Sequence, residues 1–269
     1  MARPNSPLAV LVAVALSAGC RPASSPEAAG TERGGSALAG RGMPPPDREQ
    51  PEPQPSSTEV PIDSDDAVWG DANAPVTIVV FTDLECPYCA HGHAVMSELS
   101  RHYGPWRVRV VIKHIPLAMH PQAVPAARVA QAVLDLGGRR RFFEYLELAY
   151  ANPEAVADGK VVELARPLGL DLAALRQRAA STEIGRQVLE DVLLADRLDV
   201  PATPHYRING LPLTGALPLK ALRAVVDKEL EEAARLRQRG VTADGVYASR
   251  VASNVSQPEP QPLSQGGNP

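Results

Sequence analysis

The sequence predicts an α/β domain that carries an inserted helical subdomain, and three observations support this fold class. The run VTIVVF at 76–81 is continuously apolar and β-branched, which is typical of a strand buried on both faces. A second strand pattern, RVRVVI at 107–112, follows a helical pattern that ends near Tyr103. Between Gln122 and Asp199 the apolar residues recur at helical spacing. The predicted order is β-α-β, a helical insertion and then β-β-α, which describes a small sheet domain with added helices.

The last elements are predicted by a turn signal and an amphipathic pattern. HYRI at 205–208 and LPLT at 211–214 flank Asn209 and Gly210. Asn-Gly is a strong hairpin signal, because both central residues of the turn need a positive φ. A helix with one apolar face is expected at 218–239.

Composition restricts the folded domain to the central part of the chain. The chain has 269 residues, and eleven of its 27 prolines lie in residues 1–62 and four in 241–269. Residues 21–60 are rich in Pro, Ser, Gly and Glu and nearly lack aromatic side chains, which predicts a disordered tether. The stretch 241–269 has the same character and is expected to be a disordered tail. We therefore expect the folded domain at 61–240, with its helical insertion at about 122–199.

Residues 1–20 have the features of an export signal. Arg3 precedes a short apolar segment at 8–16, and small residues then lead to Cys20. This arrangement resembles the bacterial lipobox, in which the cysteine is diacylated and becomes the new N-terminus. We expect lipidation of Cys20, with plain secretion as the alternative, and a position on the periplasmic side of the cell envelope. Arg21 stands where related lipoproteins kept in the inner membrane have Asp, which favours the outer membrane.

Charge argues against a nucleic-acid partner. The formal net charge is −4, and no run of Lys and Arg is long enough to form a basic patch. We expect contact with the membrane through the lipid anchor alone.

The motif Cys86-Pro87-Tyr88-Cys89 stands where the first buried strand meets a helix. Free backbone N–H groups and the positive end of the helix dipole at that point favour a thiolate over a thiol at Cys86. Pro87 suits the first helical position, because its missing N–H would have no partner there. The two-residue spacing lets Cys89 attack a mixed disulfide formed on Cys86, which is how a dithiol catalyst works.

The chain resembles the DsbA-like thiol–disulfide oxidoreductases, a branch of the thioredoxin fold, over about residues 60–240. The resemblance begins with the stretch from Gly70 to Cys89. It continues through the motifs Ile115-Pro116-Leu117, His120-Pro121, Phe142-Phe143-Glu144, Leu168-Gly169-Leu170-Asp171 and Val200-Pro201-Ala202-Thr203-Pro204. An ordered set of motifs is far more specific than C-x-x-C alone.

The resemblance implies a thioredoxin-like fold with an inserted helical subdomain and a second element of the active site. Thr203-Pro204 matches the family's cis-proline position, where the backbone of Thr203 would pair with a substrate strand. Cys86 is then the attacking nucleophile and Cys89 the resolving thiol, while Pro87 and Tyr88 tune the reduction potential. No cofactor or metal is implied beyond the redox-active Cys86–Cys89 pair.

The implied function is thiol–disulfide exchange on cysteines of exported proteins, with the chain as a disulfide donor (oxidase). The expected partners are unfolded or cysteine-containing exported proteins and a membrane or periplasmic redox partner. We expect a monomer, since no heptad pattern that would form a dimer is present. Reductase or isomerase activity of the same fold remains open, as does a non-catalytic chaperone.

Two features leave alternatives open near this motif. His91 and His93 follow Cys89, and together with the two cysteines they have the ligand chemistry of a metal-binding module, although His91 would point away from the others. His205 follows Pro204 where the family commonly has a small residue, and it could lie near the active site or face solvent.

Overall fold

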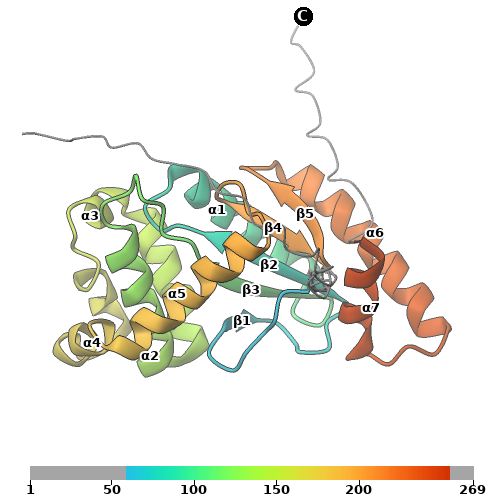
Figure 1. Cartoon of the computed structure of the whole chain (residues 1–269), viewed down its shortest axis with the longest axis horizontal. Helices are drawn as coiled ribbons and strands as arrows, with labels where there is room; N and C mark the ends of the chain where they lie inside the picture. Colours follow the sequence, from blue (N-terminus) through green and yellow to red (C-terminus); the bar gives the residue numbers. More distant parts are fainter. Residues whose placement is uncertain (1–58, 255–269) are drawn as a thin grey trace, which may run out of the picture. The chain divides into compact units, whose positions relative to one another are not determined.

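The computed structural model describes residues 59–254, which all belong to one unit of the chain. Its centre is a five-stranded sheet in the order β1-β3-β2-β4-β5 (Figure 1). The strands are β1 (Ala67–Trp69), β2 (Val76–Thr82), β3 (Val108–His114), β4 (His205–Ile208) and β5 (Leu211–Thr214). β2 pairs with β3 in parallel, and the other three pairings are antiparallel. The predicted export signal, Cys20 and residues 21–58 of the predicted tether lie outside the described residues.

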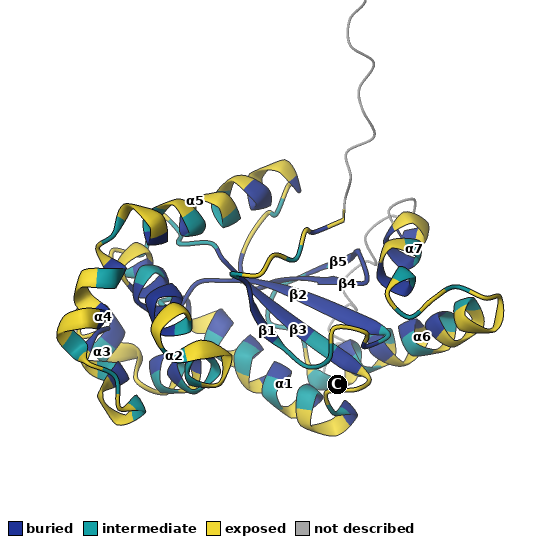
Figure 2. Cartoon of the chain, turned by 90° about the horizontal axis from the view of Figure 1, so that it is seen from below, coloured by how far each residue is buried: buried dark blue, intermediate teal, exposed yellow. Residues whose placement is uncertain are grey.

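The central strand β2 is buried along its whole length, as its continuous apolar run predicts (Figure 2). Alternate residues supply two cores on opposite faces of the sheet. Ile78 and Val80 join the larger core, which includes side chains of α1 (Pro87–Tyr103), α2 (Ala123–Ala151) and α6 (Leu219–Gln238). Val79 and Phe81 join the smaller core on the other face, which is covered by α5 (Thr182–Arg197). Helices therefore cover both faces of the strand that leads to the cysteines.

Five helical elements connect β3 to β4. They are α2, α3 (Pro153–Ala157), the 3-10 helix η1 (Glu163–Leu168), α4 (Leu172–Ala179) and α5. Gly138 interrupts α2 with a φ of +76°, a value that glycine adopts without strain. The side chains of Asp171 and Ser181 accept hydrogen bonds from backbone N–H groups in the first turns of α4 and α5.

The end of the described chain differs from the sequence-based expectation. The composition predicts disorder from residue 241 onward, whereas the structure has a helix there, α7 (Gly245–Asn254). Its buried Arg250 donates two hydrogen bonds of 2.8 Å to Glu229 of α6. The other boundary also moves slightly, because Val60, expected in the tether, is buried in the smaller core.

None of the helices formed by residues 59–254 is both long and apolar enough to cross a bilayer.

Candidate active site

The two cysteines of the motif lie at the junction of β2 and α1. Cys86 is the residue before the helix, with an extended backbone, and Pro87 begins the helix. The carbonyl oxygen of Cys86 accepts hydrogen bonds from the N–H groups of Cys89 and Ala90, at 3.0 and 3.2 Å. Its thiol makes no hydrogen bond to the free N–H groups of the first turn. The favouring of a thiolate by the helix N-terminus therefore stays a prediction.

Both cysteines are thiols in this structure, but their surroundings differ. Cys86 is 5% exposed at the end of the helix, whereas Cys89, one turn further in, is 1% exposed. Tyr88, between them, projects outward with an exposed fraction of 66%. The side of the motif on which Tyr88 lies therefore faces solvent.

Thr203 and Pro204 lie against the cysteines although they are more than a hundred residues away in sequence. The peptide bond between them is cis, as the resemblance predicts. The sulfur of Cys86 lies 3.9 Å from the carbonyl oxygen of Thr203. The structure thus brings together Cys86, Pro87, Tyr88, Cys89, Thr203 and Pro204, which are the site residues predicted within the domain.

Burial controls the protonation of the Cys89 thiol. Loss of hydration raises the pKa of the Cys89 thiol to about 12. The nearby Thr203 and Thr82 hydroxyls act in the opposite direction and do not overcome the burial. The N–H of Asp83 also points at this sulfur, at 3.4 Å. Cys89 is therefore held as a neutral thiol at neutral pH, and it is a weak nucleophile until its proton has been removed.

Asp83 organises the loop beside the cysteines, a role that sequence reasoning missed. Its Oδ1 accepts a hydrogen bond from the N–H of Glu85, and its Oδ2 accepts one from the N–H of Leu117. The same Oδ2 lies 2.7 Å from Nδ1 of His120. The first of these bonds is an Asp side chain bound to the backbone two residues later, which is a recognisable turn signal. The other two depend on where the loop at 115–122 packs.

His205 lies on the opposite face of the sheet from the side chain of Tyr206. It is 2% exposed, so the expectation that it could face solvent is wrong. Its Nδ1 lies 2.8 Å from the hydroxyl of Thr214, and its ring packs 6.0 Å from that of Phe81. Burial lowers the pKa of His205 to about 4. The residue supports the hairpin from the smaller core.

The cysteines and histidines near the motif do not form a metal-ligand cluster in the part of the chain that the structure describes. His91 is exposed on the outer side of α1. His93 turns inward and lies against Glu147 of α2.

Comparison with known proteins agrees with this architecture. The sequence profile of the family described as thioredoxin matches residues 63–228. The α-DsbA1 protein of Wolbachia pipientis has a similar fold, with a TM-score of 0.59 and 21% identity over 66% of this chain and 97% of that chain. BdbD of Bacillus subtilis in its oxidised form gives a TM-score of 0.56 and 20% identity over 62% of this chain and 94% of that one.

A curated relative is more similar in sequence but much longer. A protein named Na(+)/H(+) antiporter NhaA 3 from Salinispora tropica is 36% identical over 183 residues. The match covers 67% of this chain and 27% of that protein. The name therefore describes a protein of which the matched segment is about a quarter.

Proposed function

The chain belongs to the thioredoxin family, and on that premise we propose that it catalyses thiol–disulfide exchange on proteins through Cys86 and Cys89. The observation that carries the proposal is the placement of the two thiols. Cys86 precedes α1, next to the exposed Tyr88, and its sulfur lies 3.9 Å from the carbonyl oxygen of Thr203, whereas Cys89 lies one turn further into the helix with a pKa raised to about 12. Cys86 is accordingly the attacking thiol and Cys89 the resolving one.

The exchange proceeds through a mixed disulfide. A substrate thiolate attacks the sulfur of Cys86 in the Cys86–Cys89 disulfide, and the bond to Cys89 breaks. A second substrate thiol then attacks the substrate sulfur of the mixed disulfide and releases Cys86, so that two electrons pass from the substrate to the cysteine pair. The reverse sequence reduces a substrate disulfide. Thr203 and the cis-Pro204, beside Cys86, are proposed to hold the substrate strand through main-chain hydrogen bonds.

Single cysteine replacements test this assignment. Cys86→Ser should reduce insulin-reduction and oxidative-refolding activity to the level without protein. Cys89→Ser should leave the attacking thiol intact and accumulate a mixed disulfide on Cys86, detected by intact-mass measurement. Cys20→Ser, which removes the cysteine outside the motif, is the matched control and should keep full activity. Full activity of the Cys86→Ser variant would disprove the mechanism, and an inactive wild type in both assays would instead favour a non-catalytic chaperone.

We propose further that the chain acts as a disulfide donor to exported proteins. The N-terminal export-type sequence supports this direction, because disulfides form and persist outside the cytosol. We expect the reduction potential of the Cys86–Cys89 pair, measured against glutathione, to lie above about −200 mV, closer to strong oxidants than to thioredoxin at about −270 mV. A potential near the thioredoxin value would favour a reductase instead.

A further inference from the structure

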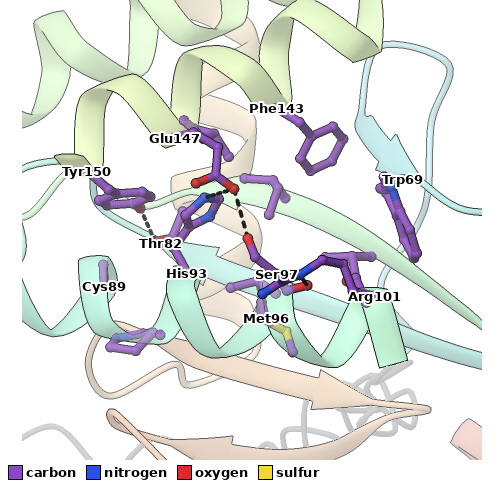
Figure 3. Close-up of a pocket in the computed structure, with 17 residues that line it drawn as sticks. Trp69, Thr82, Cys89, His93, Met96, Ser97, Arg101, Phe143, Glu147 and Tyr150 are labelled. Carbon is purple, nitrogen blue, oxygen red and sulfur yellow. Dashed lines mark hydrogen bonds and ion pairs between the residues drawn. The ribbon is translucent and has the colours of Figure 1, made fainter. Parts of the chain in front are cut away.

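A cavity of about 370 Å³ lies between α1, α2 and the sheet, and Cys89 is part of its wall (Figure 3). Apolar side chains such as Trp69, Met96 and Phe143 line most of it. The polar side chains that line it include His93 and Tyr150, and also Arg101 at the end away from Cys89 (Figure 3). The exchange described above assigns no role to this cavity.

The chemistry of Cys89 requires a group that can accept its proton and return it. Whenever the Cys86–Cys89 disulfide opens, Cys89 leaves as a thiolate, and whenever the disulfide closes, Cys89 must lose its proton. Cys89 is 1% exposed, so bulk water cannot exchange this proton directly. An uncompensated thiolate in such a place is costly, which is why burial raises the pKa of the thiol so far.

His93 is placed to take part in this transfer. Residues four apart on a helix lie on the same face, so Cys89, His93 and Ser97 follow one another along the side of α1 that faces the cavity (Figure 3). The side chain of His93 is 14% exposed, and its Nε2 lies 3.1 Å from Oε1 of Glu147. Ser97 donates a hydrogen bond of 2.9 Å to the same oxygen. The side chain of Glu147 is 61% exposed, so the pair joins the cavity to solvent.

Two hydroxyl-bearing residues contact Cys89, His93 and each other. The Thr82 hydroxyl interacts with the Cys89 sulfur and lies 2.6 Å from the hydroxyl of Tyr150. The ring of Tyr150 in turn packs on that of His93, with centroids 4.9 Å apart. Beside these polar groups, a cavity of about 370 Å³ also has room for water.

The other titratable groups near Cys89 are less suited to this task. The carboxylate of Asp83 is engaged by Glu85, Leu117 and His120, and only its backbone N–H points at Cys89. Burial raises the pKa of Tyr150 well above its usual value, so its hydroxyl stays neutral. Besides His93, the titratable side chains that line the cavity come from two helices. They are Cys89 and Arg101 of α1 and Glu147 and Tyr150 of α2. The lining strand residues, among them Thr82 and Ile112, do not titrate in this range.

We propose that His93, oriented by Glu147, is the positioning residue that exchanges the proton of Cys89 with solvent. The inference rests on the proposed thiol–disulfide exchange. When the disulfide closes, neutral His93 accepts the proton through the cavity, the Cys89 thiolate attacks the sulfur of Cys86, and the substrate leaves as a thiolate. When the disulfide opens, the same route returns a proton to Cys89.

The two steps of disulfide closure can be separated with dithiobisnitrobenzoate as the oxidant. Attack by Cys86 on this aromatic disulfide releases one coloured thiolate, and resolution by Cys89 releases a second one. His93→Gln keeps a polar side chain but removes the titrating ring. We expect it to leave the first phase unchanged and to slow the second on the order of 100-fold at neutral pH, a typical size for general acid–base assistance.

The pH profile distinguishes a proton-transfer role from a packing role. In the wild type the rate of the second phase should rise with pH as His93 loses its own proton. This rising limb of the pH profile should be absent in His93→Gln. Burial lowers the pKa of His93, and Glu147 acts against this by favouring the protonated imidazole. Glu147→Gln should therefore move the midpoint of the limb to lower pH. Imidazole added to His93→Ala should restore part of the second phase.

His91→Gln is the matched control, because the same residue type two positions away is exposed and does not line the cavity. Both of its phases should match the wild type. An unchanged second phase in His93→Gln, or an equal slowing of both phases, would overturn the role of His93 while leaving the exchange itself intact. Absence of the first phase in the wild type would count against the proposed function instead.

Discussion

Gly92 is the residue of α1 against which the second half of the site packs. A Cβ at this position would lie 2.4 Å from the hydroxyl of Tyr206 and 3.1 Å from the ring of Pro204. Tyr206 is fully buried and cannot move aside without disturbing the larger core. The absence of a side chain at Gly92 therefore sets how closely the cis-proline segment approaches the helix that carries the cysteines.

Gly92→Ala should destabilise the fold by about 1–3 kcal/mol, the usual cost of overpacking a core. This outcome opposes the helix propensity of alanine, which alone would stabilise the helix by up to about 1 kcal/mol. Urea unfolding monitored by circular dichroism measures the change. Gly185→Ala in α5 is the matched control, because its new Cβ would meet only the guanidinium end of Arg128, at 3.1 Å. Equal stability changes in the two variants would contradict the packing argument.

The site residues that could be predicted from sequence are those whose placement is local or carried by a motif. The spacing of Cys86 and Cys89 and the strand–helix junction fix their positions on the helix, and Thr203-Pro204 was identified through the resemblance. The role of Asp83 was not predictable in full, because two of its partners lie in a loop more than thirty residues away. The burial of His205 likewise depends on contacts across the sheet, which a strand pattern alone does not specify.

Among the elements, the predicted strands and helices of the sheet domain are present, and the two that were missed are short. β1 has three residues, Ala67–Trp69, which is too short for an alternating pattern to be recognised. α7 (Gly245–Asn254) follows a polar stretch, and its apolar face is narrow. Its stability depends on a buried network that no local pattern reveals. Arg250 and Asn254 bind Glu229, and the amide nitrogen of Asn209 at the hairpin turn lies 3.1 Å from the same carboxylate.

One carboxylate of α5 adds polar contacts to the apolar packing of the helical insertion against the sheet. Asp191 accepts a hydrogen bond of 2.8 Å from the N–H of His114 and lies 3.3 Å from the ammonium group of Lys113, both at the end of β3. Lys113 also binds Asp66, at 2.6 Å. The buried Lys113 thus faces the buried Asp66 and the largely buried Asp191, and desolvation raises the pKa of Asp191 to about 7. The titration of Asp191 makes this joint sensitive to pH.

For the molecule as a whole, buried histidines and buried carboxylates have opposite effects on stability as pH falls. Burial lowers the pKa of His114 and of His205 to about 4. In the unfolded chain both imidazoles take up a proton near pH 6.5, so each contributes stability above that value that is lost as the pH falls toward about 4. Asp191 has a raised pKa, and its contribution is present at low pH and lost as the pH rises through about 7. Asp66 acts in the same direction as Asp191, because its pKa is also raised.

Removing the titration of Asp191 should therefore expose the acid sensitivity of the histidines. As the pH falls from about 7.5 to about 5, the titration of each buried histidine is expected to lower the free energy of unfolding by about 2 kcal/mol. The titration of Asp191 is expected to raise it by about the same amount. Asp191→Asn keeps a side-chain oxygen that can accept the hydrogen bond from the N–H of His114, but it removes the group that titrates. Its free energy of unfolding, measured by urea titration at both pH values, should fall by about 2 kcal/mol more than that of the wild type.

His205→Gln should change the pH dependence in the opposite direction, because it removes one of the two acid-sensitive groups and keeps a polar partner for Thr214. Its unfolding free energy should fall by about 2 kcal/mol less than that of the wild type over the same pH range. Parallel pH dependences for Asp191→Asn, His205→Gln and the wild type would mean that these groups titrate alike in the folded and unfolded chains, and that the joint between α5 and β3 does not set the acid response.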